Sequence, residues 1–482
     1  MTTDGLTLGL VAAVLALGVW LALRGSASNP VVVKLAGLKW TRADFCRGWL
    51  ITGDTGSGKT RSGITPLLYQ IFQNEPGWGG LCIDDKGLYW ETLCEMARHF
   101  GREHDLILLQ VRPDDAPSSW QPRHTYSLTS DRSIPYNTFA KAVVDTASSL
   151  GQAGDKGFFR NQAQTHIAAA LETLREIGAD VTLENAYHLL LDQSDLDEAM
   201  TDLASSQQTA RRRELVAHFT NRFLSQPPEQ IGGVKETIAN YLQAFVTPDI
   251  AQVFCPAANT FDFEEIDRGK IICVAMPQKF QTERRYVNTF LKMLFYTHAL
   301  RRFDKSKEDR QHDNLIVLWA DEAQRFVTAS EEGMSDYNCV DVIREAQATV
   351  VAAAQSSTSF IPPLGREKAR VFTLNLRNRL IFKAADEEGA LESSDFIGKA
   401  KVIKKSWGYT GEGCLETTPS RRSTASSLTS CGQWASMSPS SCIASADTVA
   451  SCCRRWSPTE RCPDGSGAVY EAFFDRPWSP PN

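Results

Sequence analysis

The sequence predicts an α/β fold: a buried parallel sheet flanked by helices, interrupted by an all-helical insertion and preceded by one membrane helix. Three observations lead to it. An apolar run at 49–52 leads into a glycine-rich loop, a second apolar run at 315–320 ends in two acidic residues, and helical periodicity fills much of the chain between them. The 482 residues are 42% hydrophobic and 22% charged, a composition that excludes extensive disorder.

The first predicted element is a membrane helix at residues 5–23. This stretch has no charged residue, and at about 1.5 Å per residue it is long enough to cross the hydrocarbon core. A secretory signal peptide is the alternative, but nothing basic precedes Gly5 and no small-residue cleavage site follows closely. Basic residues follow the segment and Asp4 precedes it. We therefore expect a single-pass protein of the bacterial inner membrane with the bulk of the chain in the cytoplasm.

A phosphate-binding loop follows the first apolar run. The motif G-x-x-x-x-G-K-[ST] is matched by Gly53, Asp54, Thr55, Gly56, Ser57, Gly58, Lys59 and Thr60, and a helix-compatible stretch follows. The glycines allow backbone N–H groups to point at phosphates, and the helix N-terminus favours the same negative charge. We expect Lys59 to contact the β- and γ-phosphates of ATP and the Thr60 hydroxyl to bind Mg²⁺.

The second half of the site is expected where two further strands end. The run 315–320 ends at Asp321 and Glu322, of which Asp321 would hold Mg²⁺ and Glu322 would polarise the attacking water. The run 350–354 ends at Gln355, which would approach the γ-phosphate as a sensor. An ordinary polar residue at a strand end is the other interpretation of Gln355. The pair of half-sites favours ATP hydrolysis over binding alone.

An insertion is required because Lys59 and Asp321 are 262 positions apart, whereas a few βαβ crossovers need only about 60–100 residues. Helical spacing of apolar residues runs from about 145 to 250. The fold expected is a RecA-like P-loop core with an inserted all-α domain. Its expected parts are a membrane anchor at 1–28, the first part of the nucleotide-binding domain at 29–144, the insertion at 145–250, the second part at 251–408 and an irregular tail at 409–482.

With these motifs in order, the chain resembles the type IV coupling proteins, the TraG/TraD-like ATPases of conjugation and type IV secretion. The resemblance rests on the glycine loop, Asp84 to Gly87, Pro135 to Asn137, Asp321 to Gln324, and Gln355 with Ser356. It implies a homo-hexamer that uses ATP and Mg²⁺. Such a hexamer would move single-stranded DNA, bound to a relaxase, through secretion channel proteins of the inner membrane.

The resemblance also implies a trans-acting arginine. Arg344 stands eleven residues before Gln355, where the family carries such a residue, and it would reach the ATP site of a neighbouring subunit. A surface arginine is the alternative. The chain departs from the family in having one candidate membrane helix where two are usual, and its net charge of −6 gives no visible DNA footprint.

The last part of the chain changes in character. Residues 410–463 are rich in Cys, Ser, Thr, Trp and Arg and have no apolar periodicity, which suggests a frameshifted stretch. Two other functions stay open at this point. One is a membrane-bound assembly ATPase for phage or pilus subunits without DNA dependence, and the other is a membrane recruiter whose ATP site only switches shape.

Overall fold

The computed structural model of the protein describes residues 30–149, 157–205, 209–329 and 334–397, and five short strands between 399 and 445. The predicted membrane helix at 5–23 lies outside the described residues, as does most of the tail. No helix within the described ranges is long and apolar enough to cross a membrane. The described chain begins with an antiparallel hairpin of β1 (Val31–Leu35) and β2 (Leu38–Thr41), followed by the short helix α2 (Arg42–Phe45).

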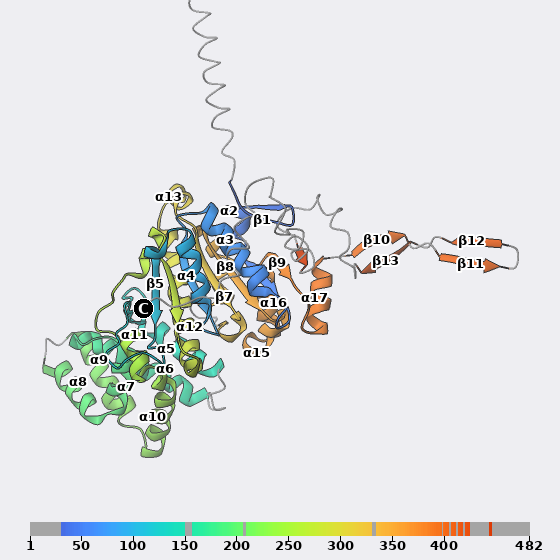
Figure 1. Cartoon of the computed structure of the whole chain (residues 1–482). Coiled ribbons are helices and arrows are strands. Elements are labelled where there is room, and N and C mark those ends of the chain that lie inside the picture. Colours follow the sequence, from blue (N-terminus) through green and yellow to red (C-terminus); the bar gives the residue numbers. More distant parts are fainter. Residues whose placement is uncertain are drawn as a thin grey trace, which may run out of the picture.

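A parallel sheet forms the centre of the molecule (Figure 1). Its strand order is β14-β9-β3-β8-β7-β4-β6-β5. The strands are β3 (Trp49–Thr52), β4 (Gly79–Asp84), β5 (Leu106–Gln110), β6 (Ile271–Ala275), β7 (Ile316–Asp321), β8 (Ala348–Ala354), β9 (Asn378–Ile381) and β14 (Ile443–Ser445). The predicted apolar runs all form strands of this sheet. Strand β8 lies between β3 and β7 and pairs with both, which is the arrangement expected of a RecA-like core.

Both faces of the sheet are buried because helices cover each of them. Alternate residues of a strand point to opposite sides, so they pack into two different cores. Trp49 and Ile51 of β3 pack with helices α3 (Thr65–Asn74) and α4 (Tyr89–His99) on one face. Leu50 packs on the other face, in the same core as α12 (Gln281–Arg301). This double coverage explains why the strands read as continuous apolar runs instead of alternating ones.

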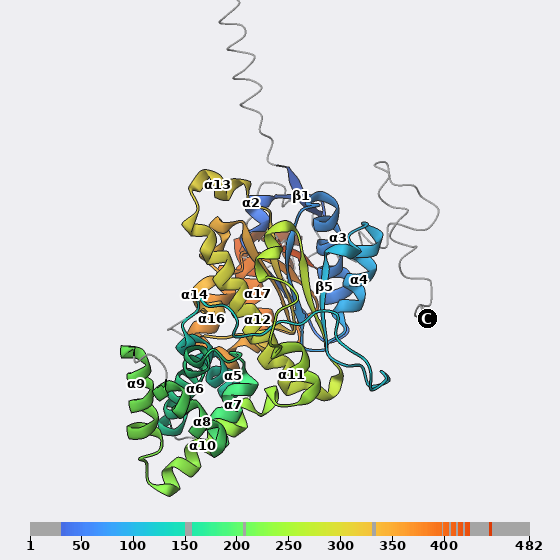
Figure 2. The ribbon, with the colours of Figure 1, turned by 90° about the vertical axis from the view of Figure 1, so that its left-hand side faces the viewer.

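All regular elements of the insertion between β5 and β6 are helices among the described residues, and they begin after an irregular stretch at 111–135. Its helices are α5 (Tyr136–Ser149), α6 (Gly157–Ile177), α7 (Leu183–Leu191), α8 (Gln193–Ser205), α9 (Ala210–His218), α10 (Pro228–Leu242) and α11 (Pro248–Phe254). Most of them lie beyond the carboxyl ends of the strands, at the lower end of the molecule in Figures 1 and 2. Helix α5 begins before the boundary expected at 145, and it packs on both α6 and the core helix α12.

The chain after β6 completes the core with short helices. They are α13 (Lys307–His312), α14 (Asp336–Cys339), α15 (Ile361–Leu364), α16 (Arg366–Asn375) and α17 (Glu387–Ile397). Four strands then form two antiparallel pairs, β10 (Lys399–Ile403) with β13 (Ser420–Thr424) and β11 (Ser406–Thr410) with β12 (Gly413–Thr417). The irregular tail predicted from 409 therefore contains β12, β13 and β14 among its described residues, and its remainder lies outside them.

Candidate active site at the carboxyl edge of the sheet

The glycine loop follows β3 and is fixed at both of its sides. Gly53 N–H donates to the carbonyl of Gln355 at 3.1 Å, and Asp54 N–H donates to the carbonyl of Lys383 at 2.7 Å. The loop is thus held between the ends of β8 and β9, the neighbours of β3 in the sheet. Lys59 is buried, and its Nζ donates to the carbonyls of Gly53 at 2.6 Å and Asp54 at 3.2 Å. The ammonium group therefore lies within the curl of the loop.

The loop has the features of a phosphate cradle. A Cβ on Gly53 would lie 2.6 Å from Ser57 Oγ and 2.5 Å from Phe382 Cβ, so only glycine fits at this position. Ser57 Oγ is buried and has no hydrogen-bond partner among the described residues. A π-helical first turn, Lys59–Ile64, begins directly after the loop. The N–H groups of a first helical turn lack intrahelical partners, and together with the free hydroxyl they suit an anion.

Thr60 and Asp321 meet at the edge of the sheet, as expected for a shared Mg²⁺. The Thr60 hydroxyl donates to Asp321 Oδ2 at 3.2 Å. Burial raises the pKa of Asp321, and the neighbouring Glu322 carboxylate raises it further. Asp84 stands beside Asp321 in the β4–β7 register, and its own pKa is raised by burial and by Asp321. A hydroxyl and a buried carboxylate within hydrogen-bond distance fit Mg²⁺, which prefers oxygen ligands and would relieve this crowding of negative charge.

Glu322 is buried and held by two side chains. Its Oε2 accepts a hydrogen bond from Gln324 Nε2 at 2.7 Å, and its Oε1 lies 3.5 Å from the Lys86 ammonium. Its backbone has a φ of +52°, a left-handed conformation that is uncommon for a residue with a side chain. Such strain concentrates at functional sites. Neither Lys86 nor Gln324 was given a role from the sequence, although the motif segments that contain them were singled out.

The turn from Asp84 to Gly87, which carries Lys86, lies close to the backbone at Met276. The Asp84 carboxylate accepts N–H bonds from Leu88 at 3.0 Å and Tyr89 at 3.3 Å and so caps the start of α4. Gly87 has a φ of +66°, and a Cβ there would lie 2.7 Å from the carbonyl oxygen of Met276. The turn therefore requires glycine at its last position, and this directs Lys86 toward Glu322.

Gln355 and Arg344 lie at opposite ends of β8. Gln355 follows the strand and borders the glycine loop through its carbonyl. Arg344 precedes the strand and is exposed. Because β8 has seven residues at about 3.3 Å each, roughly 20 Å separates the two ends. The structure thus brings Gln355, and not Arg344, to the chain's own site.

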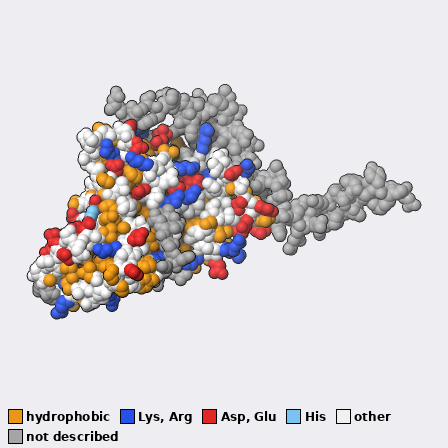
Figure 3. All heavy atoms as spheres, turned by 90° about the horizontal axis from the view of Figure 1, so that it is seen from below, with side chains coloured by type: hydrophobic (Ala, Val, Ile, Leu, Met, Phe, Trp, Pro, Cys, Tyr) orange, Lys and Arg blue, Asp and Glu red, His pale blue; other side chains and the backbone are white. Residues whose placement is uncertain are grey.

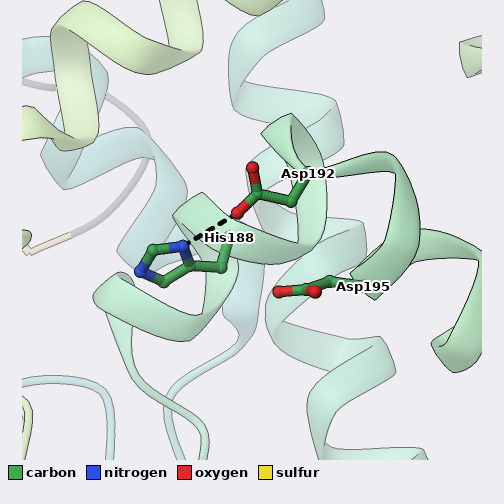
Figure 4. Close-up of side chains that lie close together, drawn as sticks. All are labelled: His188, Asp192 and Asp195. Carbon is green, nitrogen blue, oxygen red and sulfur yellow. Dashed lines mark hydrogen bonds and ion pairs between the residues drawn. The ribbon is translucent and has the colours of Figure 1, made fainter.

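A further cluster of possible ligands lies in the insertion, where α7 meets α8. Ligand atoms of His188, Asp192 and Asp195 lie within 4.8 Å of one another (Figure 4). His188 Nδ1 and Asp192 Oδ2 are 3.0 Å apart, and Asp192 is the C-cap residue of α7. All three residues are half-buried or exposed. The pair reads as a helix-end hydrogen bond, and we assign no metal to it.

Comparisons with known proteins show a shared fold. No protein-family model matches the sequence, and no curated protein matches it. Among solved structures, the bacterial conjugative coupling protein TrwBdeltaN70 in its unbound monoclinic form matches with a TM-score of 0.57 and 16% identity, covering 83% of each chain. The plasmid coupling protein TrwB in complex with ADP and Mg²⁺ matches with a TM-score of 0.55 and 15% identity, covering 82% of this chain and 83% of that one. The chain therefore has the fold of these coupling proteins.

Proposed function

We propose that this chain is a type IV coupling ATPase, which uses ATP hydrolysis to drive transfer of DNA, single-stranded and relaxase-bound, into a secretion channel. One observation carries the proposal. Strand β8 lies between β3 and β7, and Lys59, Thr60, Asp321 and Glu322 therefore share one edge of the sheet. The TrwB structures, with their 83% coverage and their complex with ADP and Mg²⁺, support the same assignment.

The proposed chemistry follows from the contacts of each side chain. Lys59 neutralises charge on the β- and γ-phosphates from within the glycine loop. Thr60 and Asp321 hold Mg²⁺, which supplies further neutralisation of the phosphates when bound. Glu322 orients the attacking water and accepts its proton, and Gln355 borders the γ-phosphate from the end of β8. The buried carboxylates and the glycine loop keep this arrangement in place before the nucleotide arrives.

Two further parts of the proposal concern assembly. Residues 5–23 anchor the chain in the bacterial inner membrane, because their length and lack of charge suit a single span. The chains form a homo-hexamer in which the exposed Arg344 of one subunit completes the ATP site of the next. The distance of Arg344 from its own site supports a role between subunits. The secretion channel proteins of the same membrane are the proposed partners.

The test is ATP hydrolysis by the full chain in detergent, with and without circular single-stranded DNA. We expect DNA to raise the rate, Lys59→Ala to abolish it, and Glu322→Gln to lower kcat by about 10²-fold or more while ATP still binds. Hydrolysis that Lys59→Ala abolishes but DNA leaves unchanged would replace the proposal with an assembly ATPase. A folded chain that binds ATP without hydrolysing it would contradict both.

A further inference from the structure

A pocket of about 930 Å³ lies at the carboxyl edge of the sheet, beside the proposed ATP site. It is bordered by α5 and α12, by the segment after β7, and by the segment from β8 to α16. We call it the cationic pocket. The residues that line it include Lys141, Asp145, Arg285, Gln324, Arg325 and Lys368.

The charge of the cationic pocket favours an anion. Among the described residues its lining holds four cations, contributed by α5, α12, α16 and the segment after β7, and the carboxylate of Asp145, which lies 3.5 Å from the Lys141 ammonium. Asp85 lies 3.3 Å from Arg285 and 3.7 Å from Arg325 and offsets part of this charge from outside the lining. Figure 3 views the molecule from below and shows Lys and Arg side chains near the middle of that face, with Asp and Glu side chains among them.

The arrangement suits a chain of phosphates better than one phosphate. A single anion is held by donors that converge on a point, as in the glycine loop. The cations of the cationic pocket instead stand on four separate elements around a volume at the upper end of that found for small-molecule sites. Spaced Lys and Arg side chains along a groove are the usual contacts of a single-stranded nucleic-acid backbone.

Gln324 belongs to both the cationic pocket and the ATP site. Its Nε2 donates to Glu322 Oε2 at 2.7 Å, while the side chain itself lines the pocket. Its Oε1 is buried and has no hydrogen-bond partner in the described parts of the chain. Gln355 is shared in the same way, because it lines the pocket and its carbonyl accepts from Gly53 of the glycine loop. The side chain of Gln324 and the backbone of Gln355 thus connect the two sites.

We infer that the cationic pocket binds the phosphodiester backbone of a nucleic-acid strand and that Gln324 makes hydrolysis depend on it. The inference rests on the proposed function and adds a regulatory contact to it. In the arrangement described above, the Gln324 amide donates to Glu322 Oε2, one of the oxygens that must accept from water. A strand phosphate in the pocket accepts the Gln324 N–H instead, and Oε2 becomes free. Gln324 is therefore a positioning residue and not a catalytic one.

The first test removes the amide. Gln324→Leu in the full chain should raise hydrolysis without DNA by about tenfold, the scale of one hydrogen bond to a charged group. Circular single-stranded DNA should then give no further increase, while the KM for ATP stays unchanged. Gln311→Leu on α13, an exposed glutamine at the opposite edge of the sheet, is the matched control and should retain the stimulation of the unmodified chain.

The second test removes pocket charges one at a time. Lys141→Gln and Lys368→Gln should each weaken oligothymidylate binding and reduce the slope of log affinity against log salt by about 0.7, the value for one lost contact to a single strand. ATP binding should be unchanged. Lys307→Gln on α13 is the control for charge alone and should keep the slope of the unmodified chain.

The outcomes separate this inference from the proposed function. If the unmodified chain is stimulated by DNA and Gln324→Leu is stimulated to the same degree, the coupling through Gln324 is wrong while the proposed function stands. If the two lysine variants bind oligothymidylate like the unmodified chain, the pocket is not the strand site. If the unmodified chain hydrolyses ATP without any response to DNA, the proposed function and the inference fall together.

Discussion

The carboxylates at the end of β7 are held by a small number of cationic and amide contacts. Asp84, Asp321 and Glu322 are buried close together, and burial raises the pKa of the first two. Lys86 is the cation that lowers the pKa of Asp321, and it pairs with Glu322 at 3.5 Å. At the residue scale, the site is therefore a cluster of negative charge that one turn lysine and the expected Mg²⁺ must balance.

Replacing Lys86 tests this balance. Without its charge the pKa of Asp321 should rise further, so a larger share of Asp321 is protonated at acidic pH and Mg²⁺ binds more weakly there. Lys86→Met should raise the Mg²⁺ concentration needed for half-maximal hydrolysis, and the increase should grow as pH falls. Mg²⁺ titrations at several pH values measure this. Lys279→Met, which removes an exposed lysine paired with Asp114, is the control, and an equal change in both variants would refute the account.

At the scale of elements, the segment after β7 is tied to α12 by a buried ion pair. Lys292 of α12 pairs with Asp336 of α14, and Tyr296 donates to the same carboxylate at 2.6 Å. Asp336 also accepts the N–H of Thr328 at 2.8 Å, and Lys292 donates to the carbonyl of Phe326. These contacts fix the strand-to-helix segment that follows Glu322 and Gln324, so they stabilise the geometry of both sites.

Loss of one partner in this network should be costly. Asp336→Ala leaves the Lys292 ammonium buried without its carboxylate, and breaking such a pair typically costs about 3–5 kcal/mol. Urea unfolding followed by circular dichroism measures the change. Asp114→Ala, which breaks the exposed pair with Lys279, should leave the free energy of unfolding nearly unchanged. Similar losses of unfolding free energy in the two variants would show that the buried pair of Lys292 and Asp336 stabilises the fold no more than an exposed pair does.

The helical insertion should weaken at acidic pH. His166 is fully buried, with Nδ1 2.9 Å from His218 Nε2, and burial, with His218, lowers the pKa of His166 to about 3. The unfolded chain binds this proton below about pH 6.5, so the free energy of unfolding should fall as pH drops from there toward 3. One such group contributes at most about 1.4 kcal/mol per pH unit.

Urea unfolding at a series of pH values checks this expectation. His166→Phe keeps an aromatic ring beside Phe223 but removes the titrating group, and it should flatten the dependence. His104→Phe, at a histidine that is largely exposed, should leave the dependence as it is. A dependence that persists unchanged in His166→Phe would assign it to other groups.

The strands could be predicted from the sequence because both faces of this sheet are buried. Runs such as 315–320 contain only apolar residues, and an acidic pair marks where the strand ends. Helix starts were also readable where a side chain caps them. A threonine ahead of a helical apolar pattern is a typical N-cap, and Thr182 Oγ1 accepts from Asn185 N–H at 3.0 Å at the start of α7.

The contacts within the site could not be predicted in the same way. Lys86 and Glu322 are far apart in the chain, and they meet because β4 and β7 pair in register and Gly87 permits the tight turn. Gln324 holds Glu322 because of the left-handed backbone at Glu322, which no local pattern indicates. The roles assigned to Lys59, Asp321, Glu322, Gln355 and Arg344 remain predictions, to be tested by the experiments above.

At the scale of the whole molecule, the site lies at one edge of the sheet and Arg344 at the other. A closed ring of identical subunits places different surfaces of neighbours in contact, so an exposed residue far from its own site is able to serve the next one. Arg344 meets this condition, because it is exposed and roughly 20 Å from Gln355 along β8. The geometry thus leads to a specific expectation for mixed assemblies.

Mixing two inactive variants tests the arrangement between subunits. Lys59→Ala disables the site of its own subunit, and Arg344→Ala disables only the neighbour's site. A mixed ring should therefore contain some sites with both groups intact and regain part of the lost hydrolysis. ATP hydrolysis of equimolar mixtures measures this. Mixtures no more active than either variant alone would show that Arg344 acts within its own chain or has no catalytic role.

The central claim is that hydrolysis at this site moves a DNA strand. The direct measurement is displacement of streptavidin from a biotinylated single-stranded oligonucleotide by the full chain with ATP and Mg²⁺. We predict displacement that requires ATP and is lost in Glu322→Gln, although that variant still binds both ATP and the strand. ATP hydrolysis at full rate without any displacement would contradict the claim, because the energy released at the site would then not be coupled to movement along DNA.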